Sequence, residues 1–236
     1  MRQVIETCSG RFVDILEPKV EQIHLPDIAH ALALQCRFNG HVRTHYSIAE
    51  HCVRVARHMP APLRIHGLLH DAAEAYLGDI VTPVKRQLAE FAALEDRCLA
   101  TIYEALAVPL PNPAAEKEVK RADALALKEE AYALLPSRGR WGQGIEPVPP
   151  EFPVECWTGP RAEVRWLSAV CAVLGAADAW EQAGLYKQAP ADGLSCILIQ
   201  DNGATEFHGI PTYTALAIGQ YADARTDSLT RSLSLL

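Results

Sequence analysis

Apolar residues recur at intervals of three and four over much of the chain before residue 183, which is the spacing of helices with one buried face. The pattern predicts helices at residues 28–35, 48–58, 63–76, 87–107, 113–135 and 161–182. Residues 1–25 instead contain short extended runs, and an alternating pattern around Asn202-Gly203 is typical of a β-hairpin. We therefore expect an all-α protein with a short N-terminal extended segment and a small irregular or hairpin C-terminal tail.

The same pattern suggests how the chain is divided. Residues 137–159 are rich in Pro and Gly and show little periodicity, so we expect an irregular excursion there. We predict one domain over residues 1–183 and a C-terminal extension of unknown role over residues 184–236. A chain of 236 residues buries enough surface to fold without disulfides or a structural metal, so a bound metal is expected to serve catalysis.

The composition limits which cellular compartments and which classes of partner are expected. The net charge is −7 and no run of Lys and Arg occurs, which argues against a nucleic-acid polymer as partner. The seven cysteines form no C-x-x-C pair, as is common for reduced cytoplasmic thiols. No signal peptide and no run of about 18 apolar residues is present. These features predict a soluble protein without membrane contact, in a bacterial cytoplasm or, if phage-encoded, in that of the host.

Charged residues interrupt the otherwise apolar helix predicted at 63–76. His70 and Asp71 follow Leu68-Leu69 directly, and Glu74 lies one turn later. Ionisable side chains are costly to bury unless they are paired or bind a cation. The cluster therefore predicts a metal site.

Two further polar residues fall on buried helix faces. His51 shares a face with apolar residues of helix 48–58, and Asp123 lies in the apolar stripe of helix 113–135. Alone, His51 is more readily explained as a core histidine and Asp123 as a buried hydrogen-bond acceptor. Together with His70 and Asp71 they form a nitrogen and oxygen set suited to Co, Mn, Zn, Mg or Fe, and the lack of nearby thiolates argues against structural zinc.

Three segments resemble the H…HD…D signature of the HD-domain phosphohydrolases. They are Ser47-Ile48-Ala49-Glu50-His51, then His70-Asp71-Ala72-Ala73-Glu74 with Gly78-Asp79, and Lys120-Arg121-Ala122-Asp123-Ala124-Leu125. The branch with bacterial 5′-deoxynucleotidases and phage dATP triphosphohydrolases is most similar, over about residues 25–180. The resemblance implies an HD-domain helical bundle, often oligomeric, whose metal ligands are His51, His70, Asp71 and Asp123.

The resemblance also implies roles around the metal. Glu74 matches an acidic residue that orients or deprotonates the attacking water, and Asp79 matches one that binds substrate or an additional metal. The residues implied in substrate binding, to phosphate or by stacking on the base, are Arg37, Phe38, Arg43, Thr82 and Lys85. Phe38 departs from the family, which often has Trp there.

The function implied is metal-dependent hydrolysis at the 5′ phosphorus of a deoxynucleotide. A 5′-deoxynucleotidase acting on monophosphates is favoured slightly over a dATP or dNTP triphosphohydrolase that releases triphosphate. A non-catalytic nucleotide sensor is an alternative from another class, and a cyclic-dinucleotide phosphodiesterase is less favoured because its Gly-rich motif is missing. The expected partners are a small nucleotide and further copies of the chain.

Overall fold

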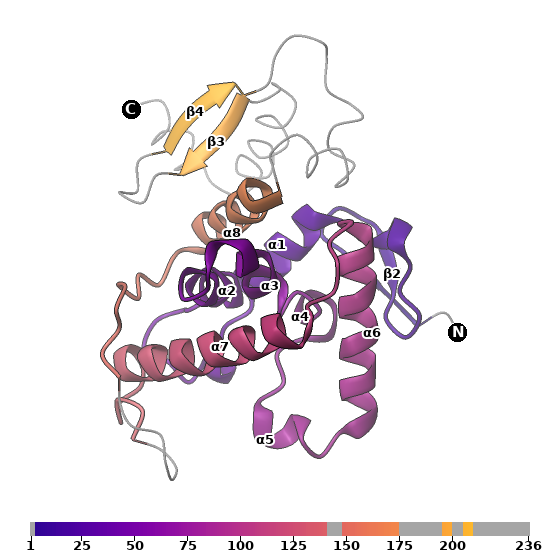
Figure 1. The fold of residues 1–236 in the computed structure, drawn as a ribbon. Coiled ribbons are helices and arrows are strands. Elements are labelled where there is room, and N and C mark those ends of the chain that lie inside the picture. The colour runs from indigo at the N-terminus through magenta and orange to yellow at the C-terminus, as the bar shows by residue number, and fades with distance from the viewer. Residues whose placement is uncertain (1–2, 141–147, 175–194, 200–204, 210–236) are drawn as a thin grey trace. The chain divides into compact units, whose positions relative to one another are not determined.

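The computed structural model describes residues 3–140, 148–174, 195–199 and 205–209, and it divides the chain into two compact units, Met1–Val173 and Leu174–Leu236. The expected all-α class is confirmed, since helices dominate the first unit (Figure 1). The predicted division into 1–183 and 184–236 stays a prediction, because the residues around that boundary lie outside the described ranges.

The elements are as follows. The helices are α1 (Leu25–Leu34), α2 (Ile48–Arg57), α3 (Arg64–Leu69), α4 (Glu74–Leu77), α5 (Thr82–Lys85), α6 (Ala89–Ala105), α7 (Pro113–Leu134) and α8 (Gly159–Leu174). Short 3₁₀ turns are η1 (Val20–Gln22), η2 (Phe38–Gly40) and η3 (Ala61–Leu63). The strands are β1 (Val4–Glu6), β2 (Phe12–Asp14), β3 (Ser195–Ile199) and β4 (Thr205–Gly209). No helix in these ranges is long and apolar enough to cross a membrane.

The N-terminal segment forms the expected hairpin. β1 and β2 pair in antiparallel fashion with Ile5 opposite Val13. Their turn contacts the first helix, because Thr7 Oγ1 and Ser9 Oγ donate to Asp27 Oδ2 at 2.8 and 2.7 Å. Helix α1 begins at Leu25, three residues before the predicted start, with Pro26 in its first turn where no backbone donor is required.

Helix α2 lies close to the prediction, and of the two reciprocal contacts that Ser47 and Glu50 could make as a capping box only one is formed. The Glu50 backbone N–H donates to Ser47 Oγ at 3.0 Å, as expected for an N-cap. The Glu50 carboxylate does not return to the Ser47 backbone. It accepts instead from the backbone N–H groups of residues 155–157, at 2.9, 3.1 and 2.6 Å. This contact holds the irregular segment 148–158 against α2.

The single helix predicted at 63–76 is wrong. α3 ends at Leu69, a tight turn follows, and α4 resumes at Glu74. Within the turn, backbone N–H groups donate to the carbonyl three residues earlier, for example Glu74 N to Asp71 O at 3.0 Å. This is the tighter 3₁₀ pattern, and it falls where His70 and Asp71 lie. Helix α4 ends at Gly78, whose φ of 82° is a conformation that glycine adopts readily.

Helices α2, α3 and α7 pack together and carry the site. α2 contacts both α3 and α7. Gly67 permits the close approach of α3 to α2, because a Cβ there would lie 2.6 Å from Met59 Sδ and 3.0 Å from the Ala56 backbone. Val55 and Met59 of the α2 side pack with Ala122 and Ala126 of α7 in a buried cluster.

The remaining predictions are met in part. α6 and α7 match their predicted ranges closely, and residues 148–158 are irregular as expected. α8 is described to Leu174, and its predicted continuation to residue 182 lies outside the described residues. β3 and β4 form an antiparallel hairpin with Ile197 opposite Phe207, while the predicted Asn202-Gly203 turn also lies outside.

Candidate metal centre

The four residues predicted as metal ligands come together from α2, the turn after α3, and α7. His51 Nε2 lies 3.3 Å from His70 Nε2, 3.5 Å from Asp71 Oδ2 and 3.2 Å from Asp123 Oδ1. His70 Nε2 lies 3.2 Å from Asp71 Oδ2. His51, His70 and Asp123 each offer a ligand atom within 4.8 Å of the other two, and Asp71 approaches both histidines, so the four residues form a donor set that could hold a divalent cation.

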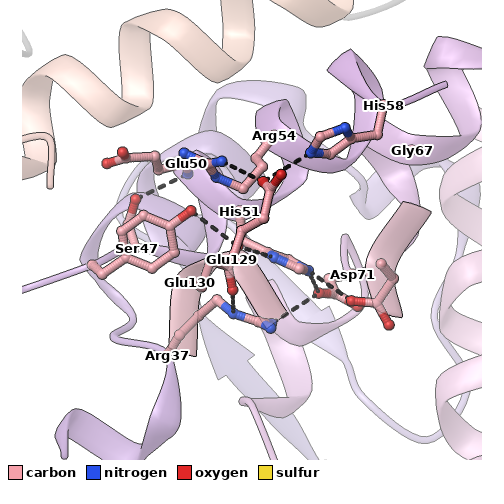
Figure 2. Close-up of polar contacts among 12 residues, drawn as sticks. Arg37, Ser47, Glu50, His51, Arg54, His58, Gly67, Asp71, Glu129 and Glu130 are labelled. Carbon is pink, nitrogen blue, oxygen red and sulfur yellow. Dashed lines mark hydrogen bonds and ion pairs between the residues drawn. The ribbon is translucent and has the colours of Figure 1, made fainter. Parts of the chain in front are cut away.

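The two histidines are oriented by their other ring nitrogens. His51 Nδ1 lies 2.7 Å from Glu130 Oε1, as Figure 2 shows, and His70 Nδ1 lies 2.9 Å from Gly67 O. Each contact places a proton on Nδ1, so that Nε2 offers a lone pair whenever it carries no proton itself. Two such lone pairs 3.3 Å apart repel each other unless a proton or a cation lies between them. The arrangement is that of metal-binding histidines supported by outer acceptors.

Charge also favours a divalent cation. Burial raises the pKa of the carboxyls of Asp71, Asp123 and Glu130, but neighbouring histidines and, for Asp71 and Glu130, Arg37 outweigh it and hold each pKa below its usual value. Three carboxylates then face one buried guanidinium, that of Arg37. Despite burial, the same carboxylates raise the pKa of His51 and His70, so a divalent cation bound at their Nε2 atoms would take the place of protons that the cluster otherwise holds.

Arg37 is held inside this cluster. Its Nε donates to Glu130 Oε2 at 3.1 Å, and its Nη1 lies 3.7 Å from Asp71 Oδ2. Its guanidinium also lies 5.6 Å from the centre of the Phe38 ring. Phe38 and Asn39 have φ values of 56° and 50°, a left-handed conformation that is costly for an aromatic residue. Such strain is often found beside functional sites.

A cavity of about 130 Å³ adjoins the cluster. Its lining residues are His70, Asp71, Ala73, Glu74, Lys85, Glu95, Asp96 and Leu99. Glu74 is 5% exposed; its Oε1 lies 3.7 Å from Lys85 Nζ, and its Oε2 has no hydrogen-bond partner in the described part of the chain. Burial and the carboxylates of Asp71 and Asp79 raise the pKa of Glu74 to about 9. Lys85 also donates to Glu95 at 2.7 Å, so carboxylates outnumber cations in the cavity.

The other predicted residues lie at varied distances from this centre. Asp79 is half-buried; burial and, in part, the nearby Asp71 carboxylate raise its pKa. Its backbone N–H donates to Gln35 Oε1 at 3.2 Å, and Gln35 Nε2 donates to Glu74 O at 2.8 Å. Arg43 and Thr82 are exposed, and across the described ranges no hydrogen bond or ion pair joins either side chain to the cluster.

A thiol that was not expected lies beside the ligands. Cys52 follows His51 in α2, and its Sγ is close enough to His70 and Asp71 to share an ion with them. Burial raises the pKa of Cys52 to about 11, so the thiol stays protonated at neutral pH. The sequence argument against structural zinc assumed that no cysteine lies near the ligands, and the position of Cys52 contradicts that assumption.

Sequence reasoning missed Glu130. This fully buried carboxylate accepts from Tyr46 Oη at 3.0 Å, besides its contacts with His51 and Arg37. It lies seven residues after Asp123 on α7, and residues seven apart share a helix face. That spacing was a signal for Glu130 in the sequence.

Fold and site together define an all-α protein with a partly buried His and Asp cluster suited to a divalent cation. Uncharacterized protein YfdR of Escherichia coli (strain K12) is 34% identical over 145 residues, which cover 61% of this chain and 80% of that protein. Uncharacterized protein RCAP_rcc00048 of Rhodobacter capsulatus is 39% identical over 134 residues, which cover 52% of this chain and 68% of that protein. The chain belongs to the family of these proteins.

A family model supplies a second relationship. Residues 162–236 match the model of peptidyl-tRNA hydrolase PTH2. The described part of this match is most of α8 with β3 and β4. The matched family is one of hydrolases, which supports the enzymatic part of the sequence prediction at that coarse level.

These comparisons correct the assignment made from the resemblance. The matching model is that of PTH2 and not of an HD-domain phosphohydrolase, and the relatives' names carry no HD description. The predicted 5′-deoxynucleotidase, triphosphohydrolase and nucleotide-sensor functions are therefore overturned. The prediction that a small nucleotide is the only substrate is overturned as well, because the matched family is named for the hydrolysis of peptidyl-tRNA. Neither comparison supports the expected homo-oligomer.

Proposed function

We propose that the chain is a divalent-metal-dependent hydrolase whose centre lies between α2, α3 and α7. The observation that carries this proposal is the 3.3 Å approach of His51 Nε2 to His70 Nε2 with a carboxylate oxygen beside each. His51, His70, Asp71 and Asp123 would hold the cation. Mn, Co, Zn, Mg and Fe all accept such a donor set. The predicted cytoplasmic location stays a prediction.

A divalent cation supplies Lewis-acid activation of water in such a site. The chain's own groups complete the chemistry. Glu74, with its raised pKa, holds a proton at neutral pH and can donate it to a leaving group within the adjoining cavity. Lys85 and Arg37 would supply positive charge to an anionic substrate, and Asp79 and Phe38 would help to orient it.

The metal proposal is tested with purified protein stripped by a chelator. Hydrolysis of a panel of chromogenic esters is measured before and after addition of Mn²⁺, Co²⁺, Zn²⁺ or Mg²⁺, alongside Asp123→Asn as the ligand variant. We expect activity to need an added metal and to fall at least about a hundredfold in the variant. Arg121→Gln is the matched control, because Arg121 is exposed on the same helix and lies two residues from the ligand. Activity that survives both the chelator and Asp123→Asn would contradict the proposal.

A second candidate function rests on the family match. Peptidyl-tRNA hydrolase-like cleavage of the ester between a peptide and tRNA is favoured by the PTH2 model over residues 162–236. The net charge of −7 is unfavourable for tRNA binding, so a weak and strongly salt-dependent affinity is expected.

The second candidate is tested with the full chain and an N-acetylated aminoacyl-tRNA. Release of the acylated amino acid is followed at low salt, with a parallel measurement on Asp123→Asn. Release that is unaffected by Asp123→Asn would assign this activity to the matched region and separate it from the metal centre. No release at any salt concentration would remove the second candidate and leave the first unaffected.

A further inference from the structure

Glu130 connects the two parts of the candidate centre. Its Oε1 accepts from His51 Nδ1 at 2.7 Å and from Tyr46 Oη at 3.0 Å, while its Oε2 accepts from Arg37 Nε at 3.1 Å. The side chain is fully buried, so water cannot replace any of these donors. One carboxylate therefore fixes a histidine ligand and the only guanidinium that contacts the described cluster.

We infer that Glu130 is a positioning residue that fixes the metal-binding tautomer of His51 and holds Arg37 against Asp71, an inference that rests on the proposed metal centre. Because His51 must keep its proton on Nδ1 to present a lone pair at Nε2, an acceptor is required at Oε1. Because Arg37 must present Nε to the same carboxylate, an acceptor is also required at Oε2. Only a carboxylate accepts on both sides at once.

Glutamine cannot take this place. With its carbonyl oxygen toward His51, the amide NH₂ meets Arg37 Nε, and two donors face each other. With the amide reversed, its NH₂ meets His51 Nδ1 and favours the tautomer with the proton on Nε2, where the cation would bind. Glu130→Gln therefore disturbs either Arg37 or His51 while changing the side-chain volume little.

The neighbouring residue provides a matched control. Glu129 is on the same helix and is 1% exposed, but it faces Arg54 and His58 and not the ligand cluster. Figure 2 shows the two carboxylates serving separate sets of partners. Glu129→Gln removes a buried charge at equal depth, so it reports what a general loss of packing and charge does to the centre.

The test measures binding of Mn²⁺ and Co²⁺ to the metal-stripped full chain by isothermal titration calorimetry, together with the visible absorption spectrum of the Co²⁺ form. We expect affinity to fall about 10- to 100-fold in Glu130→Gln, with a changed Co²⁺ spectrum. Glu129→Gln should keep the wild-type affinity and spectrum. If Glu130→Gln does not fold, Glu130→Asp decides, since it keeps the charge but withdraws the acceptor from His51.

The outcomes separate the inference from the proposed function. Wild-type protein that binds no divalent cation would remove the proposed metal centre itself. Wild-type binding that depends on Asp71 but is unchanged in both Glu130→Gln and Glu130→Asp would overturn only the inference about Glu130. Equal losses in the Glu129 and Glu130 variants would also overturn it, because they would show a general structural effect.

Discussion

Two clusters of histidine and carboxylate side chains connect α2 and its C-terminal end to α7, and they differ in which of their atoms already have hydrogen-bond partners. In the first, His51 and His70 direct their Nε2 lone pairs toward each other. The second comprises His58, Glu129 and Glu151, which also bring potential ligand atoms close together. Residue types alone would rank both as candidate metal sites.

In the second cluster, both carboxylate oxygens of Glu129 already accept hydrogen bonds from the protein. Arg54 Nη1 and His58 Nε2 both contact Glu129 Oε2, at 2.7 and 3.0 Å, and the Glu151 backbone N–H donates to Glu129 Oε1 at 3.0 Å. His58 Nδ1 faces Glu151 Oε2 at 3.7 Å, so each ring nitrogen of His58 already has a carboxylate neighbour. The comparison indicates that a metal site is recognised by lone pairs left without a donor. The second cluster is an anchor for residues 151–153.

The largest effect is expected from Arg54→Met, which breaks the anchor. Arg54 is 4% exposed, and its Nη2 also donates to Phe152 O and Pro153 O at 2.9 and 2.6 Å. Its removal leaves Glu129 as a buried charge without its main partner, which costs about 3–5 kcal/mol. Urea unfolding measures this loss. Mn²⁺ affinity of the folded variant should stay at the wild-type value, and a parallel loss of affinity would mean that the two clusters are not independent.

Asp71→Asn is expected to have the opposite profile. The asparagine amide lacks the charge that balances a cation beside His70, so Mn²⁺ affinity should fall at least about 100-fold. The readout is the rise in unfolding temperature on adding Mn²⁺, since a ligand at 100 times its Kd stabilises the folded state by about 2.7 kcal/mol. We expect the wild-type rise to disappear in the variant. A rise equal to that of wild type would remove Asp71 from the ligand set.

A further histidine and carboxylate pair, His24 and Asp27, lies outside both clusters. It tests whether a carboxylate that already has several hydrogen-bond donors serves stability. Asp27 lies 3.1 Å from His24 Nδ1 and accepts from the side chains of Thr7, Cys8 and Ser9. Burial would raise the pKa of Asp27, but these neighbours together hold it well below its usual value. The carboxylate therefore stabilises the fold above its unfolded pKa of about 3.9, and this contribution is lost as pH falls through the folded pKa.

Asp27→Asn should accordingly destabilise the protein by about 1.5–3 kcal/mol at pH 7, the range for hydrogen bonds to a charged group. The difference from wild type should shrink as pH falls below about 4, because the unfolded wild-type carboxyl then takes up a proton that the folded one does not. Urea unfolding at a series of pH values measures it. A difference that stays constant down to pH 3 would show that the charge of Asp27 contributes little.

Sequence patterns predicted the helices, the N-terminal hairpin and the residues of the candidate ligand set, because helical periodicity and buried polar residues are local signals. They failed at the turn after α3, where Leu68 to Ala73 read as one helix although the backbone tightens around His70 and Asp71. They also missed the contacts of Glu130 with His51 and of Glu50 with residues 155–157, since the spacing of Glu130 from Asp123 marks a helix face but not a partner some eighty positions away. The similarity of residues 162–236 to the PTH2 model was the least accessible to motif reading, because the short segments that suggested a family lie outside that region.

The smallest effect is expected from His58→Gln, which tests the comparison most directly. A glutamine amide can replace the His58 Nε2 contact with Glu129, so we expect a loss of stability below about 1 kcal/mol. Calorimetric titration should give the same Mn²⁺ stoichiometry and affinity for this variant as for wild type, because the anchor offers no free lone pair to a cation. If wild type bound two equivalents and His58→Gln bound one, the second cluster would be a metal site after all. Hydrogen bonds from protein donors would then no longer distinguish the anchor cluster from the metal-binding cluster.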